Sequence, residues 1–150
     1  MPPSSASTRA GAGLALAALC AALSACAGAE QPDVSPRAGL ACVNDSLDCI
    51  GKRKATLKAL TDDPQRAWVK ETPTPEAYAS GVRLFAYKNK KKDLSCDELL
   101  YGRKEADGAG ASLKSAGTLL TPAQVARGRM LAVEVSRELA VEHAKRCRKG

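Results

Sequence analysis

Residues 121–147 read TPAQVARGRMLAVEVSRELAVEHAKRC and carry the longest helical pattern in the chain. Thr121 and Gln124 have the spacing of a capping box, and Pro122 occupies the first helical position, so we expect a helix over 122–146. At about 100° per residue, its apolar side gathers Val125, Ala132, Val133, Val135, Leu139 and Ala140. Because this face is long, we expect the helix to be the central core element of an all-α fold.

Helical spacing recurs upstream of this segment. A helix over 46–60 should follow the capping residues Asn44-Asp45-Ser46 and should end before Pro64, because proline disfavours helical geometry in the residue before it. A second helix opens at Thr74 or Pro75. Its expected apolar face consists of Tyr78, Val82, Phe85 and Ala86.

Another capping box, formed by Ser95 and Glu98, predicts the start of a third helix. We expect this helix to stop at Gly108 and residues 108–120 to form a connection rich in Gly, Ala and Ser. An antiparallel hairpin of the last two helices would then have arms that differ by roughly 20 Å in length. No stretch alternates like a strand, so the sequence predicts a small four-helix or irregular helical bundle.

The first 25 residues have the pattern of a signal peptide. A short polar segment with Arg9 precedes residues 10–23, which consist only of Ala, Gly, Leu and one Cys. This apolar run is shorter than the roughly 20 residues that a membrane-spanning helix needs. We therefore expect residues 1–25 to be removed rather than to remain as a transmembrane anchor.

The stretch Leu23-Ser24-Ala25-Cys26 resembles the lipobox of bacterial lipoproteins. The resemblance implies that the sulfur of Cys26 receives a diacylglyceryl group, that the chain is cut before this residue, and that the new amine is often acylated. Several acyl chains give a stable membrane anchor. Ala27, which follows the cysteine, favours the outer membrane by the same resemblance. The alternative is ordinary secretory cleavage, which would leave Cys26 as a plain thiol.

The remaining chain divides into a tether and a folded domain. Residues 26–41 comprise the lipidated cysteine and a stretch of Gly, Pro and small polar residues without periodicity, which is typical of a flexible tether. Such a tether reaches roughly 20 Å. We expect residues 42–150 to form the helical domain, on the periplasmic side of the membrane.

Four cysteines of this domain remain to be assigned: Cys42, Cys49, Cys96 and Cys147. An even number in an oxidising compartment predicts two disulfides, for which three pairings are possible. We favour Cys42 with Cys49, because a helix beginning between them brings them within reach, and Cys96 with Cys147, because a hairpin brings its two ends together. The alternative, a zinc site, lacks the paired cysteine spacing, so we expect no metal and no other cofactor.

The chain is basic, with a formal net charge of +7, but aromatic residues make up only 3% of it, and no stacking platform for nucleic acid is visible. Basic residues gather at the end of the second helix and at the C-terminus: Lys88, Lys90, Lys91, Lys92, Arg146, Arg148 and Lys149. They either contact anionic lipid or form solvated helix ends that complement the helix dipole. For the lysine cluster we favour the second interpretation.

No nucleophile with its base, paired carboxylates or phosphate loop is recognisable, so we do not expect an enzyme. His143, the only histidine, falls on the apolar face of the last helix and is interpreted as a half-buried core residue. Trp68 and Tyr78 either line a partner groove or cover the core, and we favour the core.

The leading functional hypothesis is therefore a non-enzymatic cell-envelope lipoprotein whose helical module binds another envelope component, as an assembly or secretion accessory. The membrane, through the lipid, and an envelope protein are its expected partners. A second hypothesis is a basic module that binds anionic lipid or lipopolysaccharide at the membrane surface. A third is a hydrolase whose site is not recognised.

Overall fold

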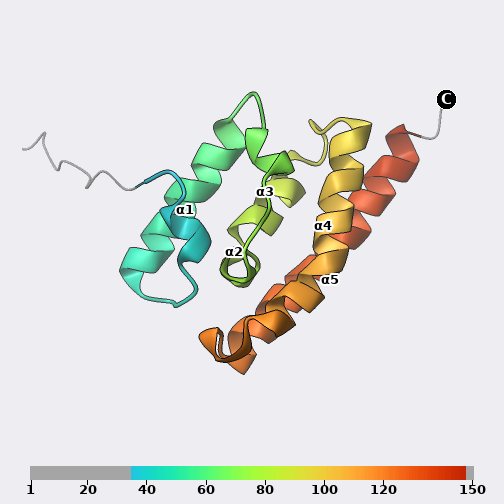
Figure 1. The fold of residues 1–150 in the computed structure, drawn as a ribbon. Helices are drawn as coiled ribbons and strands as arrows, with labels where there is room; N and C mark the ends of the chain where they lie inside the picture. The colour runs from blue at the N-terminus through green and yellow to red at the C-terminus, as the bar shows by residue number, and fades with distance from the viewer. Residues whose placement is uncertain (1–34, 148–150) are drawn as a thin grey trace, which may run out of the picture. The chain divides into compact units, whose positions relative to one another are not determined.

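The computed structural model describes residues 35–147, which fold entirely into helices and connections (Figure 1). The predicted leader, the lipobox with Cys26, Arg148 and Lys149 lie outside the described residues. The α-helices are α1 (Leu47–Asp62), α2 (Pro75–Ser80), α3 (Val82–Lys90), α4 (Cys96–Ser115) and α5 (Pro122–Arg146). Three short 3-10 helices are η1 (Ala38–Ala41), η2 (Ala67–Lys70) and η3 (Gly117–Leu119). The predicted all-α fold is confirmed, and no described helix is long and apolar enough to span a bilayer.

The hairpin of α4 and α5 forms one side of the fold, and the two helices lie side by side (Figure 1). Small residues line their contact, so that the backbones approach closely. A Cβ atom added to Gly102 would lie 2.6 Å from the ring of Tyr87 and 2.9 Å from Leu139. One added to Gly128 would lie 2.9 Å from Leu113. Close helix packing therefore depends on the absence of side chains at these two glycines.

The expectation that the third helix stops at Gly108 is wrong. Helix α4 continues to Ser115, and Ala109 and Leu113 are buried in the core. Burial of this extra length outweighs the cost of about 1 kcal/mol that each helical glycine carries. Since α4 has 20 residues and α5 has 25, their lengths differ by only about 8 Å. The expected mismatch between the arms of the hairpin disappears.

The second predicted helix is divided in two. Gly81 has a φ of +77°, which ends α2 in the left-handed region and lets α3 leave in a new direction. Because of this break, Phe85 does not join Tyr78 and Val82 in the core and is exposed instead. Val133 of α5, also expected in the core, is exposed on the outer side of its helix.

The tether was expected to extend to residue 41, and this boundary is wrong for its last residues. Residues 38–41 form η1, which packs on α1 at the buried Gly39. The amide of Gly39 donates a hydrogen bond to Thr56 Oγ1 at 2.9 Å, and a Cβ atom at Gly39 would lie 2.5 Å from the Lys52 carbonyl oxygen. The folded domain therefore begins before Cys42.

Both disulfides have the favoured pairing. Cys42 and Cys49 lie 5.2 Å apart and Cys96 and Cys147 5.8 Å apart, measured between Cα atoms. The first closes the loop before α1, and the second joins the start of α4 to the end of α5. Disulfides indicate an oxidising, extracytoplasmic environment.

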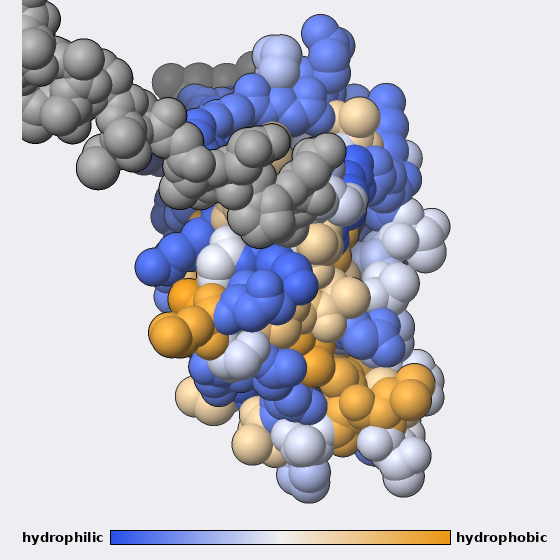
Figure 2. All heavy atoms as spheres, turned by 90° about the vertical axis from the view of Figure 1, so that its left-hand side faces the viewer, coloured by the Kyte–Doolittle hydropathy of each residue, from blue (hydrophilic) through white to orange (hydrophobic). Residues whose placement is uncertain are grey.

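The face of the domain that carries α1 is mainly hydrophilic in its upper part, and hydrophobic residues gather lower down (Figure 2). Figure 1 places the start of α1 and the turn between α4 and α5 at this lower end. Leu47, at the start of α1, and Leu119, in η3, are both exposed. The surface of the domain is therefore not uniformly polar.

We expect Gly102→Ala to lower the free energy of unfolding by about 1–3 kcal/mol, because its methyl group would collide with the ring of Tyr87. Gly108→Ala on the same helix is the matched control, because nothing lies within 4 Å of its added Cβ atom. That change should raise the free energy of unfolding by about 0.5–1 kcal/mol. Urea denaturation of both variants checks the prediction, and an equal effect of the two would contradict it.

Candidate functional site

A buried ion pair lies at the centre of the domain. The side chains of Arg83, on α3, and Glu105, on α4, are 2% and 8% exposed, and Arg83 Nη2 donates to a Glu105 carboxylate oxygen at 2.8 Å. The guanidinium also donates to the carbonyl oxygens of Val69 and Glu71. One charged side chain thus connects α3, α4 and the segment that follows Trp68.

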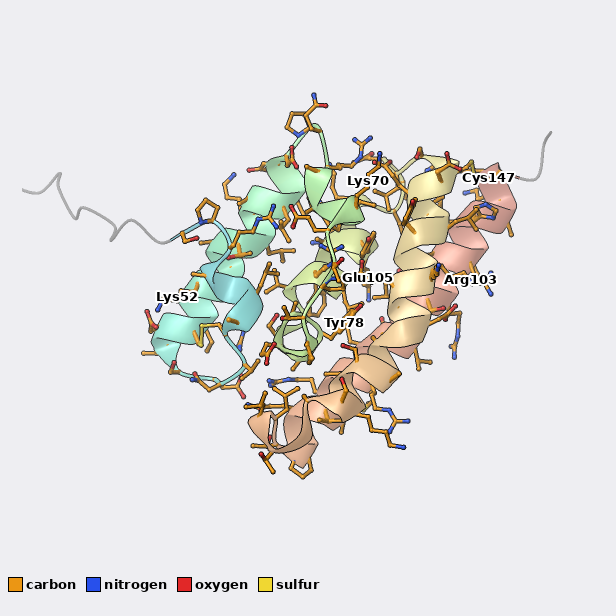
Figure 3. All side chains as sticks on the ribbon, viewed as in Figure 1. Lys52, Lys70, Tyr78, Arg103, Glu105 and Cys147 are labelled. Atoms are coloured by element: carbon orange, nitrogen blue, oxygen red, sulfur yellow. A yellow bond between two sulfur atoms is a disulfide. The ribbon has the colours of Figure 1, made fainter. Side chains whose placement is uncertain are left out.

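Aromatic side chains surround this ion pair. The Tyr87 hydroxyl donates to the Glu105 carboxylate at 2.9 Å, and the Arg83 guanidinium carbon lies 5.7 Å from the ring centroid of Trp68. Burial, together with the nearby charge of Glu105, raises the pKa of Tyr78 to about 12. Figure 3 shows Tyr78 and Glu105 in the space between α4 and the pair α2 and α3. Trp68 and Tyr78 therefore belong to the core, as the favoured interpretation had it.

The ion pair has a structural role, and the sequence analysis did not find it. Its members lie 22 positions apart in the chain, and neither belongs to a recognisable motif. The one available signal was an arginine among the apolar residues of the second predicted helix. A buried charge with its partner and hydrogen bonds in place requires no ligand.

We expect Glu105→Gln to lower the free energy of unfolding by about 3 kcal/mol, because the charge of Arg83 would remain buried without a counter-charge. The double variant Arg83→Met with Glu105→Leu removes both charges and should recover most of the loss. Urea denaturation gives both values. A double variant no more stable than Glu105→Gln would contradict the interpretation.

The lysine cluster is committed to contacts within the domain. Lys88 forms ion pairs with Glu134 and Glu138 of α5, Lys91 pairs with Glu138, and Lys90 pairs with Asp93. Hydrogen bonds from Lys91 above all, and from Lys88, lower the pKa of Glu138. The cluster therefore holds the end of α3 against α5, a role that neither sequence interpretation included.

Arg146 also acts within the domain. Its guanidinium donates to the carbonyl oxygens of Lys91, Lys92 and Leu94, in the segment that leads from α3 to α4. No ion pair of Lys92 is seen within residues 35–147. The other described basic residues of the set singled out in the sequence are engaged within the domain. Few of them thus remain available to an external anion.

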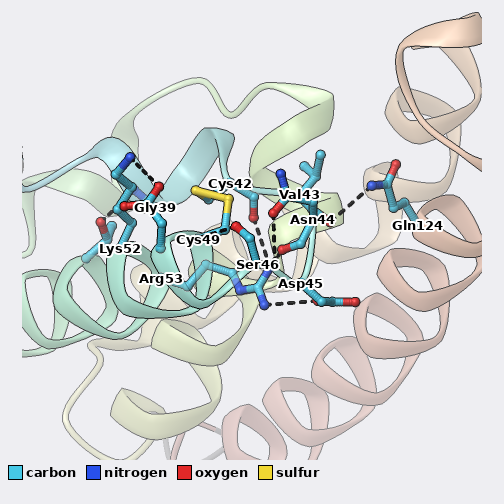
Figure 4. Close-up of a disulfide and its surroundings, with 12 residues drawn as sticks. Gly39, Cys42, Val43, Asn44, Asp45, Ser46, Cys49, Lys52, Arg53 and Gln124 are labelled. Carbon is cyan, nitrogen blue, oxygen red and sulfur yellow. Dashed lines mark hydrogen bonds and ion pairs between the residues drawn. A yellow bond between two sulfur atoms is a disulfide. The ribbon is translucent and has the colours of Figure 1, made fainter.

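The first disulfide lies in a network that joins the start of α1 to α5 (Figure 4). Arg53 donates to the carbonyl oxygen of Cys42 and forms an ion pair with Asp45. Gln124 and Arg127, both on α5, donate to the carbonyl oxygen of Val43. Hydrogen bonds from Arg53 and Arg127 lower the pKa of Asp45. The disulfide and these contacts stabilise the N-terminal edge of the domain.

Several large apolar side chains on α5 are exposed. Met130, Val133 and Val141 are 75%, 62% and 63% exposed. They lie with Arg137 on the side of α5 that faces away from its buried residues, and we name these four residues the outer row. Met130, Val133 and Arg137 also border a surface hollow together with Arg129.

Arg137, in the outer row, and Arg129, beside it, differ from the other arginines in their ion pairs. Every other arginine within residues 35–147 forms an ion pair with a described carboxylate. No such pair is seen for Arg129 or Arg137 in this part of the chain. Exposed apolar side chains and arginines without a counter-charge thus occur together on α5, and this combination makes the outer row the candidate site.

The described residues contain no cluster of three or more histidine, cysteine or acidic side chains that could hold a metal ion. His143 is half-buried on α5. Comparison with protein families, with curated proteins and with solved structures found no match for this chain.

Proposed function

We propose that this chain is a non-enzymatic, lipid-anchored protein of the bacterial cell envelope and that its helical domain binds an envelope protein through the outer row. The resemblance of residues 23–26 to a lipobox supports the anchor. The disulfides support a location outside the cytosol. The outer membrane is the favoured location, because Ala27 follows Cys26.

The observation that carries the binding function is the exposure of Met130, Val133 and Val141 along one helix. Methionine and arginine are enriched in protein interfaces, where apolar residues form the centre and charged residues the rim. The hairpin that presents the row is closely packed and is closed by the disulfide between Cys96 and Cys147. A rigid, preorganised surface loses little entropy on binding.

The second hypothesis, direct binding of anionic lipid through the basic cluster, has less support. Lys88, Lys90 and Lys91 are neutralised by carboxylates of the same domain, and Arg146 is bonded to backbone carbonyl groups. Binding to a membrane would have to compete with these contacts. The apolar side chains of the outer row border the same hollow as Glu134, and their burial need not break these contacts.

The anchor is tested by mass spectrometry of the protein from its native host. We expect a chain that begins at Cys26, carries acyl groups there and fractionates with membranes. Cys26→Ser should remove the acyl mass and release the chain into the soluble envelope fraction, whereas Cys20→Ser, within the expected leader, should change neither property. An intact Met1 on the native protein would sink this part of the proposal.

The docking surface is tested with a photoreactive amino acid at position 141, at the edge of the outer row. Irradiation of intact envelopes should give an adduct with protein, and Met130→Glu should reduce its yield by about tenfold, because a carboxylate would be buried in the interface. The same photoreactive group at Lys104, on the exposed side of α4, is the control and should give no such adduct. Equal yields at the two positions would argue against the outer row.

A further inference from the structure

We propose that the protein bound at the outer row is a second copy of this chain, whose α5 lies antiparallel to the first. This inference rests on the proposed function, because it names the partner of the same surface. Its first support is spacing. Apolar or small residues and one arginine recur on α5 at intervals of four and three, and we name these six residues the seam: Ala126, Met130, Val133 and Arg137, which are exposed, and Ala140 and Ala144, which are half-buried.

Such alternating spacing is the pattern of a helix that packs along another helix, because an average of 3.5 residues keeps the seam facing its partner. The seam from Ala126 to Ala144 is about 27 Å long at 1.5 Å per residue. A partner helix as long as α5 can cover all of it.

The same spacing is compatible with twofold symmetry. The seam is centred on Val135, so that reversing the direction of α5 exchanges Ala126 with Ala144, Met130 with Ala140, and Val133 with Arg137. An antiparallel second copy therefore offers the same seam in matching register, as an interface with twofold symmetry requires. Met130 would face a small residue, which gives the larger side chain room. All six seam positions would be used at once.

The second support is charge. In this register Arg137 lies opposite Val133 of the second copy. It therefore comes beside Glu134 of the second copy, and the twofold axis gives a second contact of the same kind. The side chain of Glu134 is 52% exposed, so it can accept a second cation besides Lys88. A parallel copy in register would instead place the two Arg137 side chains against each other. Charge thus favours the antiparallel arrangement.

A seam with three alanines buries limited apolar area, so we expect weak association of the free domain. The proposed lipid anchor would strengthen this association, because two chains held at one membrane meet at a high effective concentration. A modest interface is then sufficient for pairing on the membrane. Pairing should consequently be measured with the anchored, full-length protein.

The test uses the full chain in its native envelope, with the photoreactive amino acid at position 141. We expect an adduct with the mass of two copies, in which position 141 is joined to the segment around Arg129 of the second copy. Arg137→Glu or Glu134→Arg alone should lower its yield by about tenfold, because each change brings like charges together. The double variant Arg137→Glu with Glu134→Arg restores opposite charges in both copies and should recover the yield.

Arg103→Glu, on the exposed side of α4, is the control and should leave the yield unchanged. An adduct with a different protein would overturn the second copy as partner and leave the proposed function standing. An adduct with lipid alone, or none, would overturn both. Failure of the double variant to recover the yield, or an adduct that joins position 141 to itself, would overturn the antiparallel register.

Discussion

The buried ion pair between Arg83 and Glu105 is the contact on which the arrangement of the helices depends. Taking both charges out of water costs several kcal/mol, and this cost is offset only when the guanidinium and the carboxylate meet with good geometry. Arg83 meets Glu105 and, in addition, two carbonyl groups that follow Trp68. Other registers of α3 against α4 would leave a charge buried alone, so the pair selects one packing.

Around this centre, further charged side chains connect parts of the domain to one another. The lysines at the end of α3 pair with α5, and Asp45 joins the loop before α1 to Arg53 and Arg127. Glycines let α4 and α5 approach closely, and the two disulfides close the edges. The outer row is conspicuous against this background because its apolar side chains and its arginine have no such internal role.

Local capping signals predicted the starts of α1, α2, α4 and α5 correctly, but not that of α3. Ser46, Thr74, Ser95 and Thr121 each accept a hydrogen bond from the backbone amide three residues later, as the capping patterns predict. A cap involves residues within one turn of each other, so neighbouring letters of the sequence suffice to recognise it. The pairing of Cys42 with Cys49 was accessible for the same reason, because both lie beside such a start.

The ends of helices and the faces they bury were decided by tertiary structure. Gly108 does not end α4, because the following turns find a core to pack against, whereas Gly81 ends α2. The direction of Val133 and the partners of Arg83 and Lys91 depend on which helices meet, and these meetings join residues far apart in the chain. Sequence spacing alone thus determined the all-helical class, the caps and the pairing of Cys42 with Cys49, since these depend on near neighbours, whereas the pairing of Cys96 with Cys147 also needed the expected hairpin. Only folding determined the buried ion pair and the exposed row, because burial is a property of the packed domain as a whole.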